Sequence, residues 1–244
     1  SYKTLTEEHK DVEFWKQSDK LFKDIHMSVA LAEDYVMFLT DDCFIYRETP
    51  QLSSSFFQDK VCCYSLRLGL NTTDRAIHPD GAEGREIMIQ QPLIIMQNQP
   101  LWRYEGGIIY DRTVHPYGGY WNYPLSVDGH IFRQEDLFDW TDELVFLTKI
   151  RKWENTPNEL ESALQRFHCL IPPLVGMPES SCVVNSPNNK VQNSHKNPYA
   201  NTHSINENDM LAQYEQGKRI DLEKLELGNI KCPHTEIDLF KGLV

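Results

Sequence analysis

The adjacent carboxylates Asp41 and Asp42 are the first residues in this chain that suggest chemistry. They follow the apolar run 35–40, which is typical of a strand buried on both faces of a parallel sheet. Open α/β sheets bind ligands at the carboxyl ends of such strands. Neighbouring acids repel each other, and a divalent cation such as Mg²⁺ or Mn²⁺ would offset that repulsion. The alternative is a solvated turn in which one aspartate caps the backbone.

The elements that would position these acids form a mixed α/β pattern. An alternating run at 12–16 predicts a short strand, and the helical spacing of apolar residues predicts a helix over 21–32. With the strand 35–40, this gives a strand–helix–strand unit whose crossover should be right-handed. Other predicted elements are strands at 61–68, 86–96, 129–133 and near 182–184, and helices at 135–146, from 156 and from 204 to Gly217.

Two helix starts carry capping signals. Thr156 is placed as an N-cap, with Pro157 in the first helical position and Glu159 as the partner in a capping box. The sequence from Ser204 to Glu207 has the same pattern. No linker divides the chain, so we expect one domain over residues 1–244.

Aromatic residues and glycines crowd the stretch 98–123. Such a stretch can form a surface cleft for a flat or sugar-like ligand, or it can be an irregular structural loop. A carbohydrate-binding protein without catalytic activity is therefore one functional alternative. A metal-dependent hydrolase is another, because paired acids with a histidine can also activate water.

Charge and composition exclude several classes of function. The formal net charge of −12 argues against broad binding to nucleic acid or to an anionic membrane surface. No apolar run approaches the length of a membrane span, which is about 18 residues or more. No signal peptide is visible, and the six cysteines form no CxxC pair, so we expect reduced thiols and a cytoplasmic location.

Several segments, taken in order, resemble a bacterial and viral group of glycosyltransferases of GT-A fold. The sequence FLTDD at 38–42 resembles the metal-binding aspartate motif of such enzymes. No single motif is decisive, but the ordered set spans nearly the whole chain. The other matching segments are 65–73 (SLRLGLNTT), 123–133 (YPLSVDGHIFR), 157–161 (PNELE), 189–192 (NKVQ), 217–222 (GKRIDL) and 232–236 (CPHTE).

The resemblance implies a fold and an activity. The fold would be a Rossmann-like α/β domain with a mixed, mostly parallel central sheet flanked by helices. The activity would be transfer of a sugar, with inversion, from a nucleotide-diphosphate donor to a hydroxyl acceptor on a glycan. Asp41 and Asp42 would hold Mn²⁺ or Mg²⁺ on the diphosphate, and His234 would complete the metal site. A lone histidine after a proline is also commonly structural.

The same resemblance places an acidic pair at a helix start, where one carboxylate deprotonates the acceptor. Glu159 already has a capping role, so Glu161 is the better candidate for the base, although an acid in the first turn is also favoured by the helix dipole. Asp128 is the next candidate for the base or for a residue that binds the acceptor. Alternatively, it is only a turn residue before Gly129. Contacts to the donor are expected from Arg67, His130, Arg133, Lys218 and Arg219, of which the last two are also plausible as ordinary surface charges.

The N-terminal region departs from the family pattern. GT-A domains open with a strand, a helix and a second strand that seat the nucleotide. Here only about 40 residues precede Asp41, and they predict one strand, one helix and the strand that leads to the acids. We therefore expect that the first βα unit of the family is missing from this sequence. Either the sequence is an N-terminally truncated fragment, or the unit lies in another segment or chain, or the nucleotide site is reduced.

Overall fold

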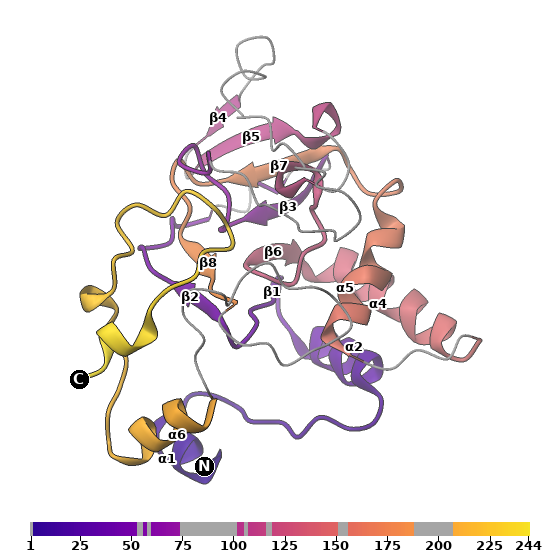
Figure 1. The fold of residues 1–244 in the computed structure, drawn as a ribbon. Helices are drawn as coiled ribbons and strands as arrows, with labels where there is room; N and C mark the ends of the chain where they lie inside the picture. Colours follow the sequence, from indigo (N-terminus) through magenta and orange to yellow (C-terminus); the bar gives the residue numbers. More distant parts are fainter. Residues whose placement is uncertain are drawn as a thin grey trace, which may run out of the picture.

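The computed structural model describes most of the chain (Figure 1). The residues that it describes are 2–52, 56–57, 60–73, 102–104, 107–115, 119–150, 156–187 and 207–244. The strand predicted at 86–96 and the capping residue Ser204 lie outside these ranges.

A six-stranded sheet forms the centre of the fold, in the order β1-β6-β3-β7-β5-β4. Only β3 and β7 are parallel, and every other neighbouring pair is antiparallel. The prediction of a mixed α/β fold is confirmed, but the prediction of a mostly parallel sheet is wrong. The strands are β1 (Tyr35–Met37), β3 (Val61–Ser65), β4 (Trp102–Tyr104), β5 (Gly107–Asp111), β6 (His130–Arg133) and β7 (Leu174–Met177).

The strand predicted at 35–40 is the edge strand β1, not a strand buried on both faces. Its ladder partner is β6, and Tyr35 and Leu39 keep 39% and 42% of their surface exposed. The strand predicted at 12–16 is absent, because residues 9–20 are exposed, form turns and irregular backbone, and pair with no described strand. The parallel strand–helix–strand unit predicted for the N-terminal region therefore does not form.

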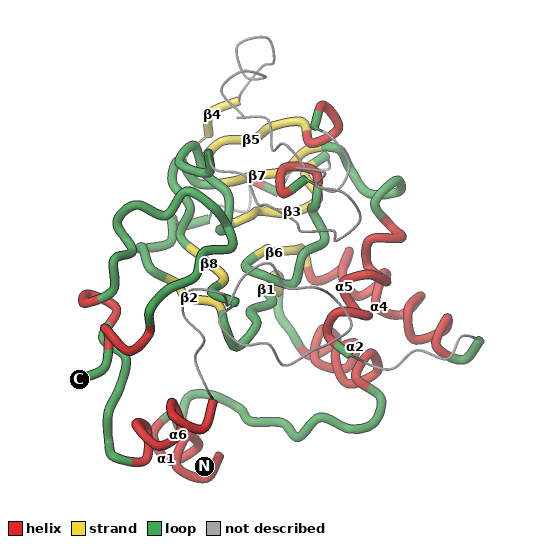
Figure 2. Tube along the Cα trace, in the orientation of Figure 1, coloured by secondary structure: helices red, strands yellow, loops and turns green. Residues whose placement is uncertain are grey.

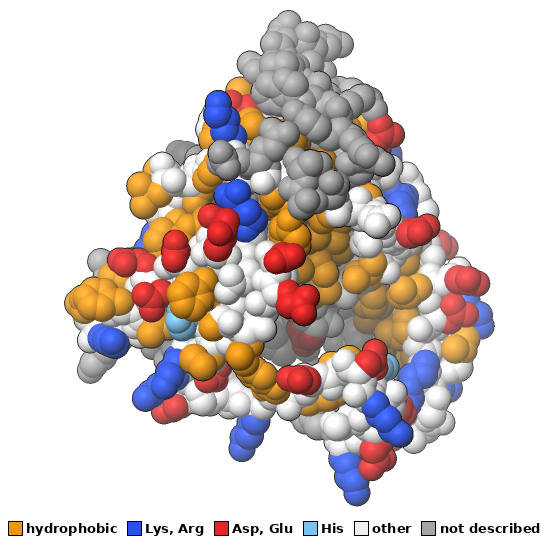
Figure 3. Space-filling view, turned by 180° about the vertical axis from the view of Figure 1, so that it is seen from behind, with side chains coloured by type: hydrophobic (Ala, Val, Ile, Leu, Met, Phe, Trp, Pro, Cys, Tyr) orange, Lys and Arg blue, Asp and Glu red, His pale blue; other side chains and the backbone are white. Residues whose placement is uncertain are grey.

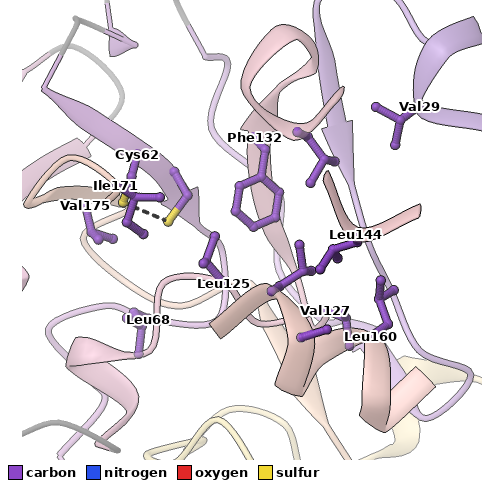
Figure 4. Packing of buried hydrophobic residues seen from close by; sticks show 14 of the residues in the cluster. Val29, Cys62, Leu68, Leu125, Val127, Phe132, Leu144, Leu160, Ile171 and Val175 are labelled. Atoms are coloured by element: carbon purple, nitrogen blue, oxygen red, sulfur yellow. Dashed lines mark hydrogen bonds between the residues drawn. The ribbon is translucent and has the colours of Figure 1, made fainter. Parts of the chain in front are cut away.

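Three helices pack against the β1–β6 end of the large sheet. α2 (Leu21–Leu31), α4 (Gln134–Thr148) and α5 (Pro157–Leu164) pack together at one end of it (Figure 1). Their apolar faces and the strands enclose the main core, in which Figure 4 shows Phe132 and Leu144 among the buried side chains. The predicted helix at 135–146 is confirmed by α4.

The remaining helices lie away from the sheet. α1 (Tyr2–Glu8) and α6 (Glu207–Glu215) lie side by side, joined by a hydrogen bond from Tyr214 Oη to Glu8 Oε2 of 3.1 Å. Gly217 has a φ of +86° just after α6, which agrees with the helix end predicted there.

A second, two-stranded sheet pairs β2 (Cys43–Ile45) with β8 (Val183–Asn185). The C-terminal segment 220–243 covers this ribbon and consists mostly of loops (Figure 2). Two hydrogen bonds between the backbones of Arg219 and Val244 join the two ends of this segment. Its apolar side chains form a small core with Val184. None of the described helices is long and apolar enough to cross a membrane.

Candidate active site

Three strand ends bring candidate residues together at one end of the large sheet. β1 and β3 both pair with β6 in the antiparallel direction. The residues that follow β1, those that follow β3 and those that precede β6 therefore lie at the same end. These segments carry Asp42, Arg67 and Asp128 respectively.

The hydroxyl of Thr40 lies between two carboxylates. Its Oγ1 is 2.7 Å from Asp42 Oδ1 and 2.9 Å from Asp128 Oδ1. Asn185 Nδ2 donates to Asp42 Oδ1 at 2.7 Å and to Thr40 Oγ1 at 3.1 Å. A hydroxyl has one proton and can donate it to only one of the two acids. The contact of the Thr40 oxygen with the other acid then has no proton between its two oxygens, and it needs a further proton or a cation to be stable.

Asp128 is a buried carboxylate that stays ionised. Arg67 Nη1 donates to its Oδ2 at 3.1 Å and to Ser126 Oγ at 2.6 Å. Burial opposes ionisation, but His234, the Arg67 guanidinium and Thr40 together hold the pKa of Asp128 well below its usual range. Asp128 is therefore a fixed negative charge at the centre of the cluster.

Asp42 has the opposite tendency. Burial raises the pKa of its carboxyl, and the charges of Asp128 and Asp41 raise it further, against a hydrogen bond from Thr40 that lowers it. Asp41 itself is exposed to solvent. The structure therefore separates the adjacent acids, with Asp42 inside the cluster and Asp41 at its solvent side.

Glu161 reaches the same cluster from α5. Thr156 caps this helix as predicted, since its hydroxyl accepts a hydrogen bond of 3.3 Å from the Glu159 backbone N–H. Burial raises the pKa of Glu161 to about 7, and the negative charge of Asp128 adds to this, while Arg67 and a hydrogen bond with Ser126 lower it. The Glu161 carboxyl therefore exchanges its proton near neutral pH.

His234 comes to the site on the C-terminal segment. The backbone of Asn185 holds this segment, because its N–H donates to Pro233 O at 2.8 Å and its carbonyl accepts from Thr235 N–H at 3.0 Å. The His234 ring lies between two partners, with Nδ1 2.6 Å from Tyr120 Oη and Nε2 3.6 Å from Asp128 Oδ2. The structure therefore places His234 beside Asp128, whereas the sequence predicted it in a metal site with Asp41 and Asp42.

His130 lies behind the cluster, on β6. Its ring is buried, neither ring nitrogen has a hydrogen-bond partner among the described residues, and it stacks on Phe132 at 6.2 Å. Burial lowers its pKa to about 3, and the Arg67 charge acts in the same direction. His130 is therefore a neutral ring that helps to keep the site dry.

Other predicted site residues have their contacts elsewhere. Arg133 lies at the other end of β6 and forms an ion pair of 2.7 Å with Asp136. Arg219 pairs with Glu8 and stacks on Tyr214, and Lys218 beside it is exposed. The structure does not bring these three basic residues to the cluster.

Glu159 lies near the start of α5, two residues before Glu161. Its Oε2 is buried and has no hydrogen-bond partner among the described residues. Its backbone N–H donates to the Thr156 cap, but no hydrogen bond within the described ranges joins its carboxylate to Thr156, so only half of the predicted capping box is present. Within the same ranges its carboxylate has no contact with Asp42, Asp128 or His234. Glu161 is therefore the better placed of the two predicted acids.

The chemistry of the cluster fits a divalent cation in part. No three His, Cys, Asp or Glu side chains within the described ranges are arranged to hold a metal ion by themselves. Asp42 and Asp128 nevertheless both contact the Thr40 hydroxyl, which can donate to only one of them, and their oxygens, with His234 beside them, are ligands that suit Mg²⁺ or Mn²⁺. Mg²⁺ is commonly held by one or two carboxylates together with water and substrate phosphates.

Sequence reasoning missed several residues of the cluster. Thr40 and Ser126 lie inside matching segments, within two residues of predicted site acids, but they are neutral and were given no role, and Asn185 lies in no matching segment. Tyr120 was counted only within an aromatic stretch. In that stretch Tyr110 and Trp121 are core residues packed edge to face, so these two do not form a sugar-binding surface.

Comparisons of this chain with protein-family models, with curated proteins and with solved structures gave no match. The interpretation of the cluster therefore depends on its own geometry and on the sequence resemblance.

Proposed function

We propose that the chain is a metal-dependent glycosyltransferase of GT-A-like fold. It would transfer a sugar from a nucleotide-diphosphate donor to a hydroxyl group of a glycan, with inversion at the anomeric carbon. The observation that carries this proposal is the meeting of Asp42, Asp128, Glu161 and His234 at one end of the sheet. The mixed α/β architecture is compatible with it, and the motifs of the sequence supply the family.

Two carboxyls in this cluster have different protonation behaviour, which suits different roles. Asp128 is held ionised, whereas the pKa of Glu161 is raised to about 7. Pairs of acids with separated pKa values are typical of acid–base catalysis. Glu161 is the general base that takes the proton of the acceptor hydroxyl, and Asp128 is a fixed charge that anchors Arg67 and His234.

The proposed reaction forms one bond at the anomeric carbon and breaks another. The acceptor hydroxyl gives its proton to Glu161, and its oxygen forms a bond to the anomeric carbon. The bond from that carbon to the diphosphate breaks, and its electron pair leaves on the phosphate oxygen. Asp42, Asp128 and His234 would hold the divalent cation, which when bound stabilises negative charge on the leaving diphosphate.

A thermal-shift panel tests this proposal. The protein is mixed with UDP, GDP, CDP or dTDP, each with and without Mn²⁺. We expect one nucleotide to raise the melting temperature only when Mn²⁺ is present, because ligand binding stabilises the folded state by mass action. Asp42→Asn should abolish this shift, and Asp34→Asn, an exposed aspartate before β1, should retain it.

Two outcomes would change the proposal. If no nucleotide gives a Mn²⁺-dependent shift, the transferase function is wrong. If the donor is bound but its sugar is released to water faster than to any acceptor, the same residues serve a hydrolase, because a carboxylate that deprotonates a hydroxyl can also deprotonate water.

A further inference from the structure

Two serines near the site, Ser65 and Ser126, are completely buried but differ in their contacts. Ser65 Oγ, on β3, has no hydrogen-bond partner among the described residues. Ser126 Oγ, in the loop before β6, contacts the Arg67 guanidinium, a backbone N–H and the carboxyl of Glu161. Burial alone therefore does not account for the contacts of Ser126.

The direction of each hydrogen bond at Ser126 follows from the chemistry of its partners. Arg67 Nη1 donates to Ser126 Oγ at 2.6 Å, and the Asp128 backbone N–H donates to the same oxygen at 3.3 Å. A guanidinium and a peptide N–H can only donate, so they occupy both lone pairs of the hydroxyl oxygen. The hydroxyl proton is left for the third partner, the Glu161 carboxyl. Because arginine stays charged in proteins, this direction does not depend on pH.

The loop before β6 holds the Glu161 carboxyl with two neighbouring donors. The Ser126 hydroxyl is one, and the Val127 backbone N–H is the other. A carboxylate can accept about four hydrogen bonds, so these two donors orient it and leave room for a further hydroxyl. We infer that Ser126 is a positioning residue whose hydroxyl, held by Arg67, orients the Glu161 carboxyl for proton transfer. The catalytic consequence of this contact rests on the proposed function.

A long side chain such as glutamate needs this support. α5 fixes the backbone of Glu161, but its side chain has several rotatable bonds of its own. A general base acts only when its oxygen lies about 2.6–3.2 Å from the atom whose proton it takes. Arg67 Nη1 also donates to Asp128 Oδ2 at 3.1 Å. One guanidinium therefore neutralises the fixed charge of Asp128 and, through Ser126, orients the base.

The contact can be tested in the metal-free protein. We would titrate ¹³C-glutamate-labelled protein by NMR and assign the Glu161 carboxyl by its loss in Glu161→Gln. Ser126→Ala removes a donor that favours the ionised carboxyl, so the pKa of Glu161 should rise by about one unit. Ser65→Ala is the matched control, because it deletes a buried serine hydroxyl that has no partner among the described residues, and it should leave this pKa unchanged. An unchanged pKa in Ser126→Ala would overturn the inference.

Turnover tests whether the contact positions the base. With the nucleotide sugar found by thermal shift, Ser126→Ala should lower kcat by about 10–100-fold, as expected for a misplaced catalytic group, and leave KM for the donor unchanged. In Glu161→Gln the same change should have no further effect, because a residue that acts through the base has nothing left to orient. An equal loss of kcat in both backgrounds would show a merely structural role. Ser65→Ala should keep the kcat of the wild type.

The two measurements separate this inference from the proposed function. If Ser126→Ala leaves the pKa of Glu161 unchanged, the positioning role is wrong even if the chain transfers sugars. If that pKa rises as expected but no nucleotide binds with Mn²⁺, Ser126 still orients the carboxyl and the transferase function does not stand.

Discussion

Two buried arginines, Arg67 and Arg112, follow strands of the same sheet but have different surroundings. Arg112 donates to the backbone carbonyls of Pro172, His168 and Ile171 and to the side chain of Asn122, with His168 Nε2 2.9 Å from its Nη1. Every partner that the described residues give it is uncharged. Arg67 instead pairs with the carboxylate of Asp128 and lies near Glu161.

Under the proposed function, the difference separates a cation that supports the fold from one that belongs to the site. The donors of Arg112 bind three backbone carbonyls of the segment 168–172, and this fixes that segment against η2 (Arg112–Val114). Arg67 neutralises the charge of Asp128. The contacts of Thr40 with Asp42 and Asp128 still lack one proton. We therefore expect changes around Arg112 to reduce stability, and changes around Arg67 to reduce function.

The largest expected effect is on turnover, at Glu161. Glu161→Gln keeps the size of the side chain but removes the base, and general-base catalysis is worth about 10²–10⁴-fold. We expect turnover to fall by that factor, with donor binding retained, in single-turnover assays with the nucleotide sugar found by thermal shift. Glu143→Gln, at an exposed glutamate of α4, is the control. Turnover within twofold of the wild type would show that Glu161 is not the base.

The next effect is on folding, at Arg112. Lysine keeps the charge in Arg112→Lys but cannot reach all the carbonyls that the guanidinium serves. Each buried acceptor left without a donor costs about 1–3 kcal/mol, so we expect the free energy of unfolding in urea to fall by roughly 3 kcal/mol. Mn²⁺-dependent nucleotide binding should be unchanged below the transition. Loss of that binding in a stable variant would remove the contrast between the two arginines.

A third effect concerns pH and the Glu161 carboxyl. Its pKa is about 7 in the folded chain against 4.5 for an ordinary glutamate, so the folded state binds the proton more tightly than the unfolded state. This contribution to stability is present below about pH 4.5 and is lost as the pH rises to about 7. We expect the wild type to lose roughly 2–3 kcal/mol relative to Glu161→Gln over this range, measured by urea unfolding. Parallel pH profiles would show that the carboxyl has an ordinary pKa.

The smallest effect is expected at Asn185, which positions Asp42. Asn185→Leu retains the volume and the backbone bonds to the His234 segment but removes the amide that donates to Asp42 Oδ1. Loss of such a partner typically lowers metal affinity by about 10–100-fold. We expect the affinity for Mn²⁺ to fall by the lower end of that range, measured from the amount of Mn²⁺ that stays free in solution. Unchanged affinity would show that Thr40 alone is sufficient to orient Asp42.

The sequence predicted the local elements better than their arrangement. The cap at Thr156, the strand at β6 and the helix α4 depend on neighbouring residues, and these predictions are confirmed. The direction of strand pairing depends on contacts far apart in the chain. An apolar run such as 35–40 does not reveal whether it will lie at the edge of a sheet or at its centre.

The candidate site was predicted where charge made residues conspicuous. Asp42, Asp128, Glu161 and His234 were chosen as acids or as a histidine in matching motifs, and the structure brings them together. Arg133, Lys218 and Arg219 were chosen in the same way, but their contacts lie elsewhere. Neutral residues such as Thr40 and Asn185 could not be found, because their importance comes only from what they touch after folding.

The meeting of strand ends has a consequence for how the site forms in time. Thr40 and Asp128 are 88 positions apart in the chain, and Tyr120 and His234 are 114 apart. Contacts between distant residues close large loops, and chains rich in them fold slowly. No short piece of this chain can therefore hold a working version of the cluster. A folding experiment should show helix signal well before His234 reaches Tyr120, so that the cluster is among the last parts of the molecule to form.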